Sequence, residues 1–508
     1  MHVSAALLIF GFPPAICFGV AFGLASRPVV ALERLVFNLP EFQSQIDVEL
    51  GDAQSADDLV KDNPDFLELD RATDGAFLHY LEAVFNAPLS VQIENVVKES
   101  VGQPLLEQAL MALSKVVQVE GLNQDNSGRM LYEALSRASK SGQPTVLGLL
   151  RQIPGESASI NFSMLVDYIA RLQRNQLQAN LLVAKEASVQ IEPELRQPLS
   201  GSWTRRQVAF QASHRPKPIQ VVVIQPKASA NGRLVVISHG LWESPNDLQG
   251  WAEYLSVNGY TVLLPEHQGS DANQQKVMLA GHQPPPGPQE LRLRALDVTA
   301  LLTAVETDDL LPGSSLNTTE VAVVGHSWGA TTAIQLAGLR PRDVTLAARC
   351  QNQDDPERNI SWILQCSWLS KINESSVEDP RVKAVVSVSP PLRLLFDPGR
   401  ASALTAKVLL VSGTRDWVVP PGPEAMTPMR VTDALRFGHR LVLAKYGGHF
   451  NLLAPANQSE PATLAPLILA WINEQLVNPG VVTFSGGGWG DAIYPLVDVS
   501  EAALKRYR

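Results

Sequence analysis

The sequence is poor in cysteine and in charged side chains, and it contains no run of lysine and arginine. Three cysteines occur among 508 residues, charged residues make up 18% of the chain, and the formal net charge is −10. A surface that binds nucleic acid needs clustered positive charge, so we expect no DNA or RNA partner. Internal repeats and metal-ligand spacings such as His-Glu-x-x-His are also absent. We therefore expect no metal and no other cofactor.

Charge is entirely absent from residues 3–26, which are strongly apolar. This segment predicts a signal peptide or membrane anchor over residues 1–31, with Gly23-Leu24-Ala25 as a small-residue cleavage site. No lysine or arginine precedes the apolar run, and Pro13-Pro14 interrupts it. A buried core helix is the alternative, although the two prolines would break a helix. We expect an exported protein, either periplasmic or anchored at the cell envelope.

The scarce cysteines fall in two regions of the chain. Cys17 lies in the leader, whereas Cys350 and Cys366 lie in one later insertion. Removal of the leader would leave an even pair in an oxidising compartment, where a Cys350–Cys366 disulfide could form. Two unpaired buried thiols are the alternative.

The length and the hydrophobic content of 45% predict a globular protein of two or three domains. Residues 44–185 show apolar side chains at helical spacing and little strand character, which predicts a small all-α domain of unknown function. A proline-containing linker follows over 186–204. The strand and helix patterns of a catalytic domain occupy 205–476, and a tail occupies 477–508.

Residues 321–329 carry the most informative motif. Val321 to Val324 predict a short buried strand, Gly325-His326-Ser327-Trp328-Gly329 follows, and a helix is predicted from Ala330. A reversal this sharp strains the backbone of the middle residue, and glycines on either side avoid clashes. The serine hydroxyl would then stand clear of the sheet, beside the N–H groups of the helix start. We predict that Ser327 is a nucleophile.

From residue 205 onward, strands alternate with helices, which predicts a mostly parallel sheet covered on both faces. Eight strands with the serine motif after the fifth match the order of the α/β-hydrolase fold. Residues 343–381 interrupt the pattern where a lid is expected. The glycine run 486–490 predicts a flexible turn. The predicted strands are Val208–Ala212, Ile219–Gln225, Leu234–Ser238, Thr261–Pro265, Val321–Val324, Val382–Val388, Val408–Ser412 and Leu441–Ala444.

A serine nucleophile needs a base, and the base needs an acid that orients it. In this fold both follow late strands, in the chain order serine, acid, histidine. The strand 408–412 ends in a polar turn that holds Asp416, and the strand 441–444 leads to a glycine-hinged turn that holds His449. We predict Asp416 as the acid and His449 as the base. Asp416 as a turn-capping residue is the alternative, and the other histidines compete with His449.

The oxyanion and the substrate also need partners. We predict that the backbone N–H groups of Leu241, after the strand 234–238, and of Trp328 bind the oxyanion, each contributing about 3 kcal/mol. Trp242 and Trp417 lie beside predicted catalytic positions and suggest an apolar substrate pocket, with ordinary packing as the alternative. His267 follows the fourth strand and is predicted to line the mouth of the site.

Three motifs carry a resemblance to a known group. Ser238-His239-Gly240-Leu241, Pro265-Glu266-His267 and Gly325-His326-Ser327-Trp328-Gly329 resemble those of bacterial predicted dienelactone hydrolases and platelet-activating-factor acetylhydrolases, and the resemblance spans about residues 205–476. Within that group the chain resembles a branch with an amino-terminal helical domain behind an export signal. The resemblance implies serine carboxylic-ester hydrolysis and the triad Ser327, Asp416 and His449.

The sequence departs from this group at three places. Dienelactone hydrolases proper use cysteine where this chain has Ser327. The acetylhydrolases place the acid after the sixth strand, where this chain has Ser389-Pro390-Pro391, so the acid has moved to Asp416. Many relatives have glycine at the position of Trp242, which leaves the size of the acyl pocket open.

We therefore expect a serine esterase that cleaves lipid-like or other apolar carboxylic esters through an acyl-enzyme, in lipid catabolism. Its partner would be a small-molecule or lipid ester, with membrane-surface association as an option and the oligomeric state open. A thioesterase or peptidase on the same triad is one alternative. A non-catalytic binding or scaffold protein of the cell envelope is another.

Overall fold

The computed structural model describes most of the chain. The described residues are 32–39, 44–50, 55–89, 91–120, 125–142, 144–184, 203–341, 344–369, 377–396, 402–456, 461–478, 489–490 and 495–504. The predicted leader over residues 1–31 lies outside them, as does most of the predicted linker 186–204. Among the described helices, none is both long enough and apolar enough to cross a bilayer.

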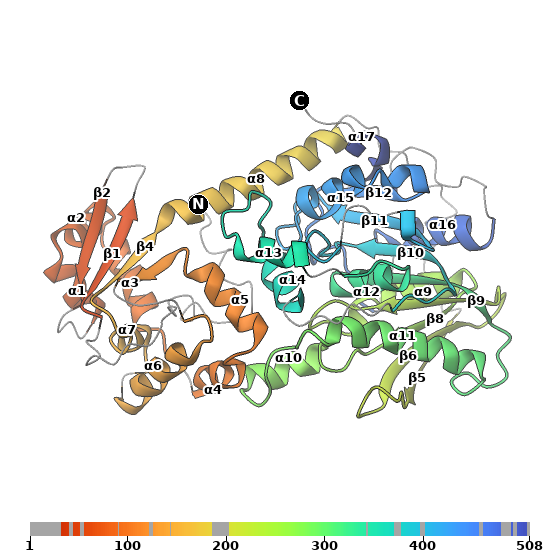
Figure 1. Cartoon of the computed structure of the whole chain (residues 1–508), viewed down its shortest axis with the longest axis horizontal. Coiled ribbons are helices and arrows are strands. Elements are labelled where there is room, and N and C mark those ends of the chain that lie inside the picture. The colour runs from red at the N-terminus through yellow and green to blue at the C-terminus, as the bar shows by residue number, and fades with distance from the viewer. Residues whose placement is uncertain are drawn as a thin grey trace. The chain divides into compact units, whose positions relative to one another are not determined.

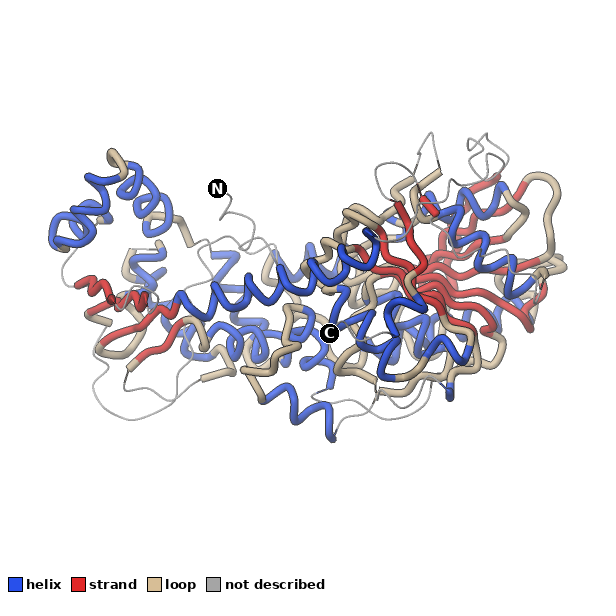
Figure 2. The backbone as a smooth tube through the Cα atoms, turned by 90° about the horizontal axis from the view of Figure 1, so that it is seen from above, coloured by secondary structure: helices blue, strands red, loops and turns tan. Residues whose placement is uncertain are grey.

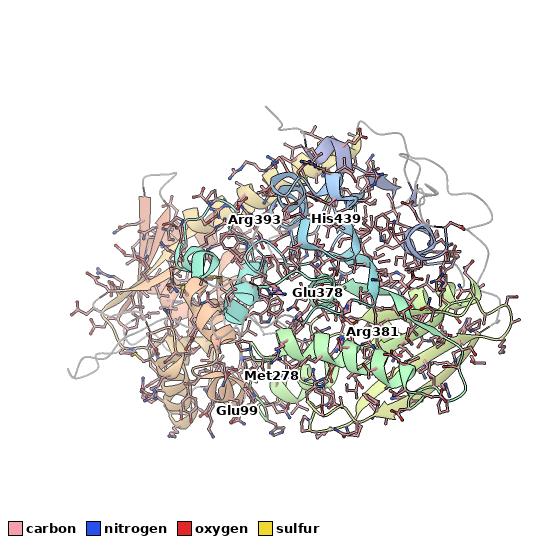
Figure 3. All side chains as sticks on the ribbon, turned by 45° about the vertical axis from the view of Figure 1, so that its right-hand side comes forward. Glu99, Met278, Glu378, Arg381, Arg393 and His439 are labelled. Carbon is pink, nitrogen blue, oxygen red and sulfur yellow. A yellow bond between two sulfur atoms is a disulfide. The ribbon has the colours of Figure 1, made fainter. Side chains whose placement is uncertain are left out.

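The chain forms two compact units (Figure 1). The first consists of the described residues up to Ala170 together with Lys276–Gly287, and the second of Arg171–Gln275 with the described residues from Pro288 onward. The division falls inside helix α8 (Phe162–Ala184), not at the predicted boundary after residue 185. The segment that contains Met278, labelled in Figure 3, groups with the first unit although the prediction assigns it to the catalytic domain.

The first unit contains helices, as predicted, but it also contains a four-stranded sheet of order β2-β1-β4-β3. It is therefore an α+β unit and not the all-α domain that the sequence suggests. Strand β1 pairs antiparallel with β2 and parallel with β4, and β3 pairs antiparallel with β4. These strands have at most six residues and lie among long helical patterns, so apolar spacing alone did not reveal them.

The elements of the first unit enclose one apolar core, to which Leu35 of β1, Phe85 of α3 and Leu131 of α6 contribute. Its strands are β1 (Arg34–Leu39), β2 (Ser44–Glu49), β3 (Val117–Val119) and β4 (Ser157–Asn161). Its helices are α1 (Ala56–Asp62), α2 (Pro64–Ala72), α3 (Ala76–Phe85), α4 (Val91–Ser100), α5 (Pro104–Leu113), α6 (Arg129–Lys140), α7 (Val146–Leu150) and the first part of α8.

The second unit is built on a ten-stranded sheet of order β13-β14-β12-β11-β10-β9-β7-β8-β6-β5. The six strands from β8 to β12 in this order are parallel, and β6 and β5 continue the sheet antiparallel. The strands are β5 (Trp203–Phe210), β6 (Ile219–Pro226), β7 (Arg233–Ser238), β8 (Thr261–Pro265), β9 (Asn317–His326), β10 (Val382–Val388), β11 (Lys407–Gly413), β12 (Arg440–Ala444), β13 (Trp489–Gly490) and β14 (Pro495–Asp498).

Eight of these strands occur where the sequence predicts them, but β13 and β14 fall in the predicted tail, and β13 includes the end of the glycine run that was predicted as a flexible turn. Strand β14 pairs antiparallel with β12, and Leu496 and Val497 are buried. The prediction missed them because they are two and four residues long and acquire their partners only through tertiary contact. The tail therefore extends the sheet, whereas its residues 479–488, 491–494 and 505–508 lie outside the described part.

Helices cover both faces of this sheet (Figure 2). Successive strand residues point to opposite faces, so Val323 of β9 packs with α11 and α12 while Val324 packs with α9 and α16. The helices are α9 (Gln249–Val257), α10 (Ala272–Leu279), α11 (Glu290–Glu306), α12 (Trp328–Leu336), α13 (Val344–Gln351), α14 (Ser361–Leu369), α15 (Thr427–Val431), α16 (Ala465–Leu476) and α17 (Ser500–Leu504).

The insertion over residues 343–381 contains α13 and α14, which a Cys350–Cys366 disulfide joins. Of the two alternatives for these cysteines, the structure has the disulfide. Trp362 and Trp368 of α14 are fully buried in the core of the second unit. Helix α14 is therefore part of the core of the second unit. This burial does not favour the predicted lid, because a mobile lid would not contribute large side chains to the core.

Candidate active site

The serine motif forms a strained turn between β9 and α12. Ser327 has φ 51° and ψ −119°, in the left-handed half of the backbone map that non-glycine residues rarely occupy. A Cβ at Gly325 would lie 2.2 Å from the carbonyl group of Gly329, and a Cβ at Gly329 would lie 1.9 Å from the carbonyl oxygen of Ser238. Neither position can hold a larger residue, which is the requirement that the motif predicts.

The structure brings together the three side chains predicted as a triad. His449 Nε2 lies 3.1 Å from Ser327 Oγ, and His449 Nδ1 lies 2.9 Å from Asp416 Oδ2. Because the carboxylate only accepts, Nδ1 carries the proton, and Nε2 of the neutral ring accepts from the serine hydroxyl. Asp416 is 0% exposed, His449 is 4% and Ser327 is 8%, so the relay is largely shielded from water.

Two interlocked turns hold the acid and the base. A Cβ at Gly413 would lie 2.3 Å from the carbonyl oxygen of Gly447, so the ends of β11 and β12 can approach only without side chains. The Arg415 N–H donates to that oxygen at 2.7 Å. Asp416 Oδ1 accepts the N–H groups of Val418 and Val419 at 2.9 and 2.7 Å, which leaves Oδ2 for the histidine. The carboxylate orientation is therefore set by backbone donors.

The predicted oxyanion donors lie in two adjoining segments. Helix α12 begins at Trp328, whose N–H is one of the first-turn groups that have no acceptor within the helix. Next to Leu241, the Gly240 N–H donates to Glu243 at 2.6 Å and the Trp242 N–H donates to the Ser270 carbonyl oxygen at 2.7 Å. Within the described residues, the Leu241 N–H has no acceptor. Both predicted donors are therefore available to a ligand, and their role stays a prediction.

A buried ion pair that the sequence reasoning missed lies beneath the triad. His326 Nδ1 lies 2.7 Å from Glu243 Oε1, and His326 Nε2 lies 2.9 Å from the carbonyl oxygen of His449. Both partners only accept, so both ring nitrogens carry protons and His326 is an imidazolium. Burial opposes this charge, but the attraction and hydrogen bond of Glu243 outweigh it and raise the pKa of His326. The pair links the segment of Gly240 to the segment of His449.

His267 does not line the mouth of the site, so this prediction is wrong. The side chain is 0% exposed, with Nδ1 2.8 Å from Asp297 Oδ2 and Nε2 2.9 Å from Ser238 Oγ. Burial and the charge of Arg294 lower its pKa to about 4, despite the hydrogen bond to Asp297. The ring is therefore neutral at pH 7, donates to the carboxylate and accepts from the serine. It belongs to a buried charge network with Arg215.

This network surrounds one buried carboxylate. Asp297 accepts hydrogen bonds from His214, His267 and Arg215 at 2.8 Å each. Burial would raise the pKa of Asp297, but these donors hold it well below its usual range. Sequence spacing could not reveal the cluster, because its members come from a loop before β6, a loop after β8 and helix α11.

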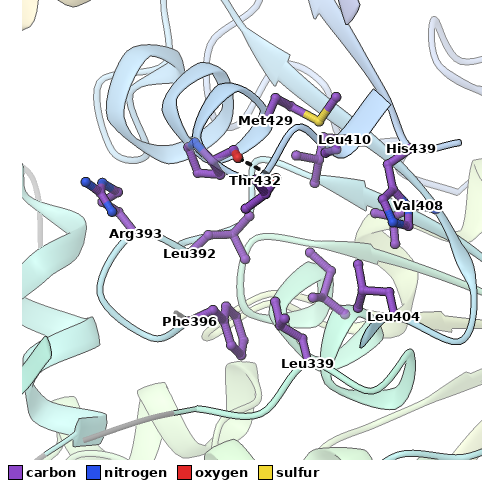
Figure 4. Close-up of a pocket in the computed structure, with 13 residues that line it drawn as sticks. Leu339, Leu392, Arg393, Phe396, Leu404, Val408, Leu410, Met429, Thr432 and His439 are labelled. Carbon is purple, nitrogen blue, oxygen red and sulfur yellow. Dashed lines mark hydrogen bonds between the residues drawn. The ribbon is translucent and has the colours of Figure 1, made fainter. Parts of the chain in front are cut away.

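The two predicted pocket tryptophans are half-buried. Trp242 has a backbone φ of 61°, and its Nε1–H donates to Gln274 at 2.8 Å. An apolar cavity of about 80 Å³ is lined by neither tryptophan and by no triad residue (Figure 4). It lies between α15, β11 and the loop after β10, with Leu392 and Val408 in its wall. The pocket roles of Trp242 and Trp417 stay predictions.

Residues 234–466 match the family model described as the alpha/beta hydrolase family. The match begins in β7 and ends in α16, so it includes Ser327, Asp416 and His449. The part of the second unit from β7 to α16 thus has the α/β-hydrolase fold, as predicted, and the match supports hydrolytic activity in general. No curated protein matches the chain.

Proposed function

We propose that this protein is a serine hydrolase that cleaves carboxylic esters through an acyl-enzyme. The observation that carries the proposal is the relay from Asp416 through His449 to Ser327, with distances of 2.9 and 3.1 Å, on a strained turn after β9. A neutral base in hydrogen-bonding contact with a serine hydroxyl is what nucleophilic catalysis at neutral pH requires.

The reaction follows from these contacts. Ser327 Oγ attacks the ester carbonyl carbon while its proton passes to His449 Nε2, and the carbonyl oxygen gains the negative charge. N–H groups of Leu241 and Trp328 stabilise that oxyanion. The C–O bond to the alcohol then breaks as His449 returns the proton to the leaving oxygen. Water, deprotonated by His449, attacks the acyl-enzyme in the same way and releases the acid and free Ser327.

The substrate class follows from the surroundings of the relay. Trp242 and Trp417 are half-buried beside the predicted oxyanion and acid segments, which favours an apolar acyl or alkyl group. The apolar leader suggests that the enzyme acts outside the cytoplasm, on lipid-like esters that include membrane-derived ones. The motifs at the ends of β7 and β8, together with the serine motif after β9, support kinship with the dienelactone hydrolase and platelet-activating-factor acetylhydrolase group.

Substitution Ser327→Ala tests the reaction. We expect the kcat for p-nitrophenyl esters to fall by at least about 10⁴-fold, because the nucleophile is lost, while the protein stays folded. Labelling of the wild-type chain by a fluorophosphonate probe should also disappear in the variant. Unchanged ester cleavage in Ser327→Ala would exclude this site.

A panel of ester, thioester and peptide substrates of matched acyl length tests the bond type. We expect the ester series to have the highest kcat/KM. The acyl-chain length with the highest kcat/KM should indicate the size of the acyl pocket. Faster cleavage of thioesters or peptides would replace the esterase assignment. Failure of the wild-type chain to react with the probe would favour a non-catalytic binding protein.

A further inference from the structure

Arg294 of α11 is a buried cation without a direct ion pair. Its side chain is 0% exposed, and among the described residues no carboxylate lies within salt-bridge distance of it. The nearby Arg215, in contrast, makes salt bridges at 2.8 Å to both Glu290 and Asp297. Burial lowers the pKa of Arg294 to about 9, so the guanidinium is still charged at neutral pH. The charges of Glu290, Asp297 and Glu243 oppose the effect of burial on this pKa, but none of these carboxylates is in direct contact with Arg294. A buried charge without a carboxylate in contact is costly, and such groups concentrate at functional sites.

The guanidinium faces the segment that leads from β7 to the predicted oxyanion donor. Its Nη2 donates to the carbonyl oxygen of His239, and its Nη1 lies 3.4 Å from the carbonyl oxygen of Gly240 and 3.3 Å from Ser270 Oγ. The same group stands over the ring of Trp328, 5.0 Å from the centroid. Arg294 thus contacts the residue before one predicted donor and the side chain of the other.

The Gly240–Leu241 peptide is clamped on both sides by these contacts. Its carbonyl oxygen accepts from Arg294 and also from His239 Nδ1 at 2.8 Å, and the preceding N–H is held by Glu243. The following N–H, of Trp242, is held by the Ser270 carbonyl oxygen. Because the Leu241 N–H belongs to the clamped peptide, its direction is determined by groups that never touch the substrate.

We propose that Arg294 is a positioning residue for the oxyanion site, which holds and polarises the Gly240–Leu241 peptide. The proposal rests on the esterase function proposed above. A cation on the carbonyl side of a peptide withdraws electron density and makes its N–H a stronger donor. Its charge also lies behind the two donors in a medium of low dielectric, where it favours the negative charge that develops on the substrate oxygen.

The experiment compares Arg294→Met and Arg294→Lys with the control Leu302→Ala. Methionine removes the charge and the donors, whereas lysine keeps the charge but not the planar fork that reaches several acceptors. Leu302 lies on the same helix and is 0% exposed, so its truncation lowers stability without touching the site. Fluorophosphonate titration gives the concentration of active sites in each purified variant. The kcat per active site, the KM and the Ki of an alkyl boronic acid are then measured.

We expect kcat to fall about 100-fold in Arg294→Met and less in Arg294→Lys, with KM unchanged. The boronic acid forms a tetrahedral adduct with Ser327, so its affinity should fall in parallel with kcat. Leu302→Ala should keep the wild-type kcat and the wild-type affinity for the boronic acid, even though its free energy of unfolding is lower. A purely structural role would lower the active fraction and stability, but it would not change kcat per active site.

The outcomes separate this inference from the function on which it depends. Wild-type protein that cleaves no ester would overturn the function itself. An active wild type with full kcat per site in both Arg294 variants would overturn the inference alone. Should Arg294→Met fail to fold, the lysine variant decides: wild-type values of kcat and Ki would exclude the positioning role.

Discussion

At the scale of single residues, the site depends on positions where there is no room for a Cβ atom, so that only glycine fits. Gly325 and Gly329 let β9 turn back onto α12 beside Ser238, and Gly413 lets the acid turn approach the base turn at Gly447. The requirement at Gly325 and Gly329 was visible in the sequence, because glycine at fixed offsets from a serine has a local steric cause, whereas the contact at Gly413 was not predicted. The partners of Glu243 and Arg294 had no such local sign.

Substitution Gly329→Ala tests the elbow. We expect the free energy of unfolding to fall by about 3 kcal/mol or more, because the new Cβ would lie 1.9 Å from the Ser238 carbonyl oxygen. The control Gly313→Ala has φ +74° and no atom within 4 Å of the added Cβ, so it should cost only about 1 kcal/mol of backbone strain. Urea denaturation gives the free energy of unfolding of each variant, and ester hydrolysis gives its activity. Equal losses of stability in the two variants would contradict the steric account.

At the scale of elements, all eight predicted strands occur, and they form one continuous part of the sheet from β12 to the edge strand β5. The apolar runs of the inner strands, such as residues 384–388 of β10, are buried on both faces and are recognisable without tertiary information. Strand β14 differs because it is stabilised by its neighbours. The Lys445 N–H donates to the carbonyl oxygen of Pro495, and the N–H of Val499, which follows β14, donates to the carbonyl oxygen of Leu441. The tail therefore completes the edge next to the strand that leads to His449.

Substitution Leu496→Ala tests this element. Leu496 is 0% exposed and packs in the core on the α9 and α16 face, so we expect a loss of about 2–5 kcal/mol in the free energy of unfolding. The control Glu501→Ala removes an exposed side chain of α17 and should change stability by less than about 0.5 kcal/mol. Chemical denaturation decides between the alternatives, since a flexible tail would make both substitutions neutral.

At the scale of the whole molecule, buried ionisable groups make stability depend on pH. The pKa of His267 is about 4 in the folded protein, whereas an unperturbed histidine has a pKa of about 6.5. Between these values the unfolded chain binds more protons than the folded one, so stability falls as pH is lowered from about 6.5 to 4. Asp297, with its lowered pKa, adds to the loss at lower pH as it becomes protonated.

Substitution His267→Gln should therefore flatten this dependence. We expect the variant to be less stable at neutral pH, because Asp297 and Ser238 lose a partner, and to lose less stability between pH 6.5 and 4. The exposed His282→Gln is the matched control and should keep the wild-type slope. Thermal unfolding across this pH range is the measurement, and parallel curves for all three proteins would contradict the role of His267.

The sequence alone determined where the eight strands lie along the chain, the glycine-flanked serine and the late strand ends that carry Asp416 and His449. Each of these depends on spacing over a few residues, set by strand periodicity and by the space around a turn. The tertiary structure alone decided that the first unit has a sheet, that the tail joins the second sheet, and that His267 is buried. It also decided that Arg294 faces Gly240. These features depend on which distant segments come into contact, and a buried charge acquires its partner only when the chain has folded around it.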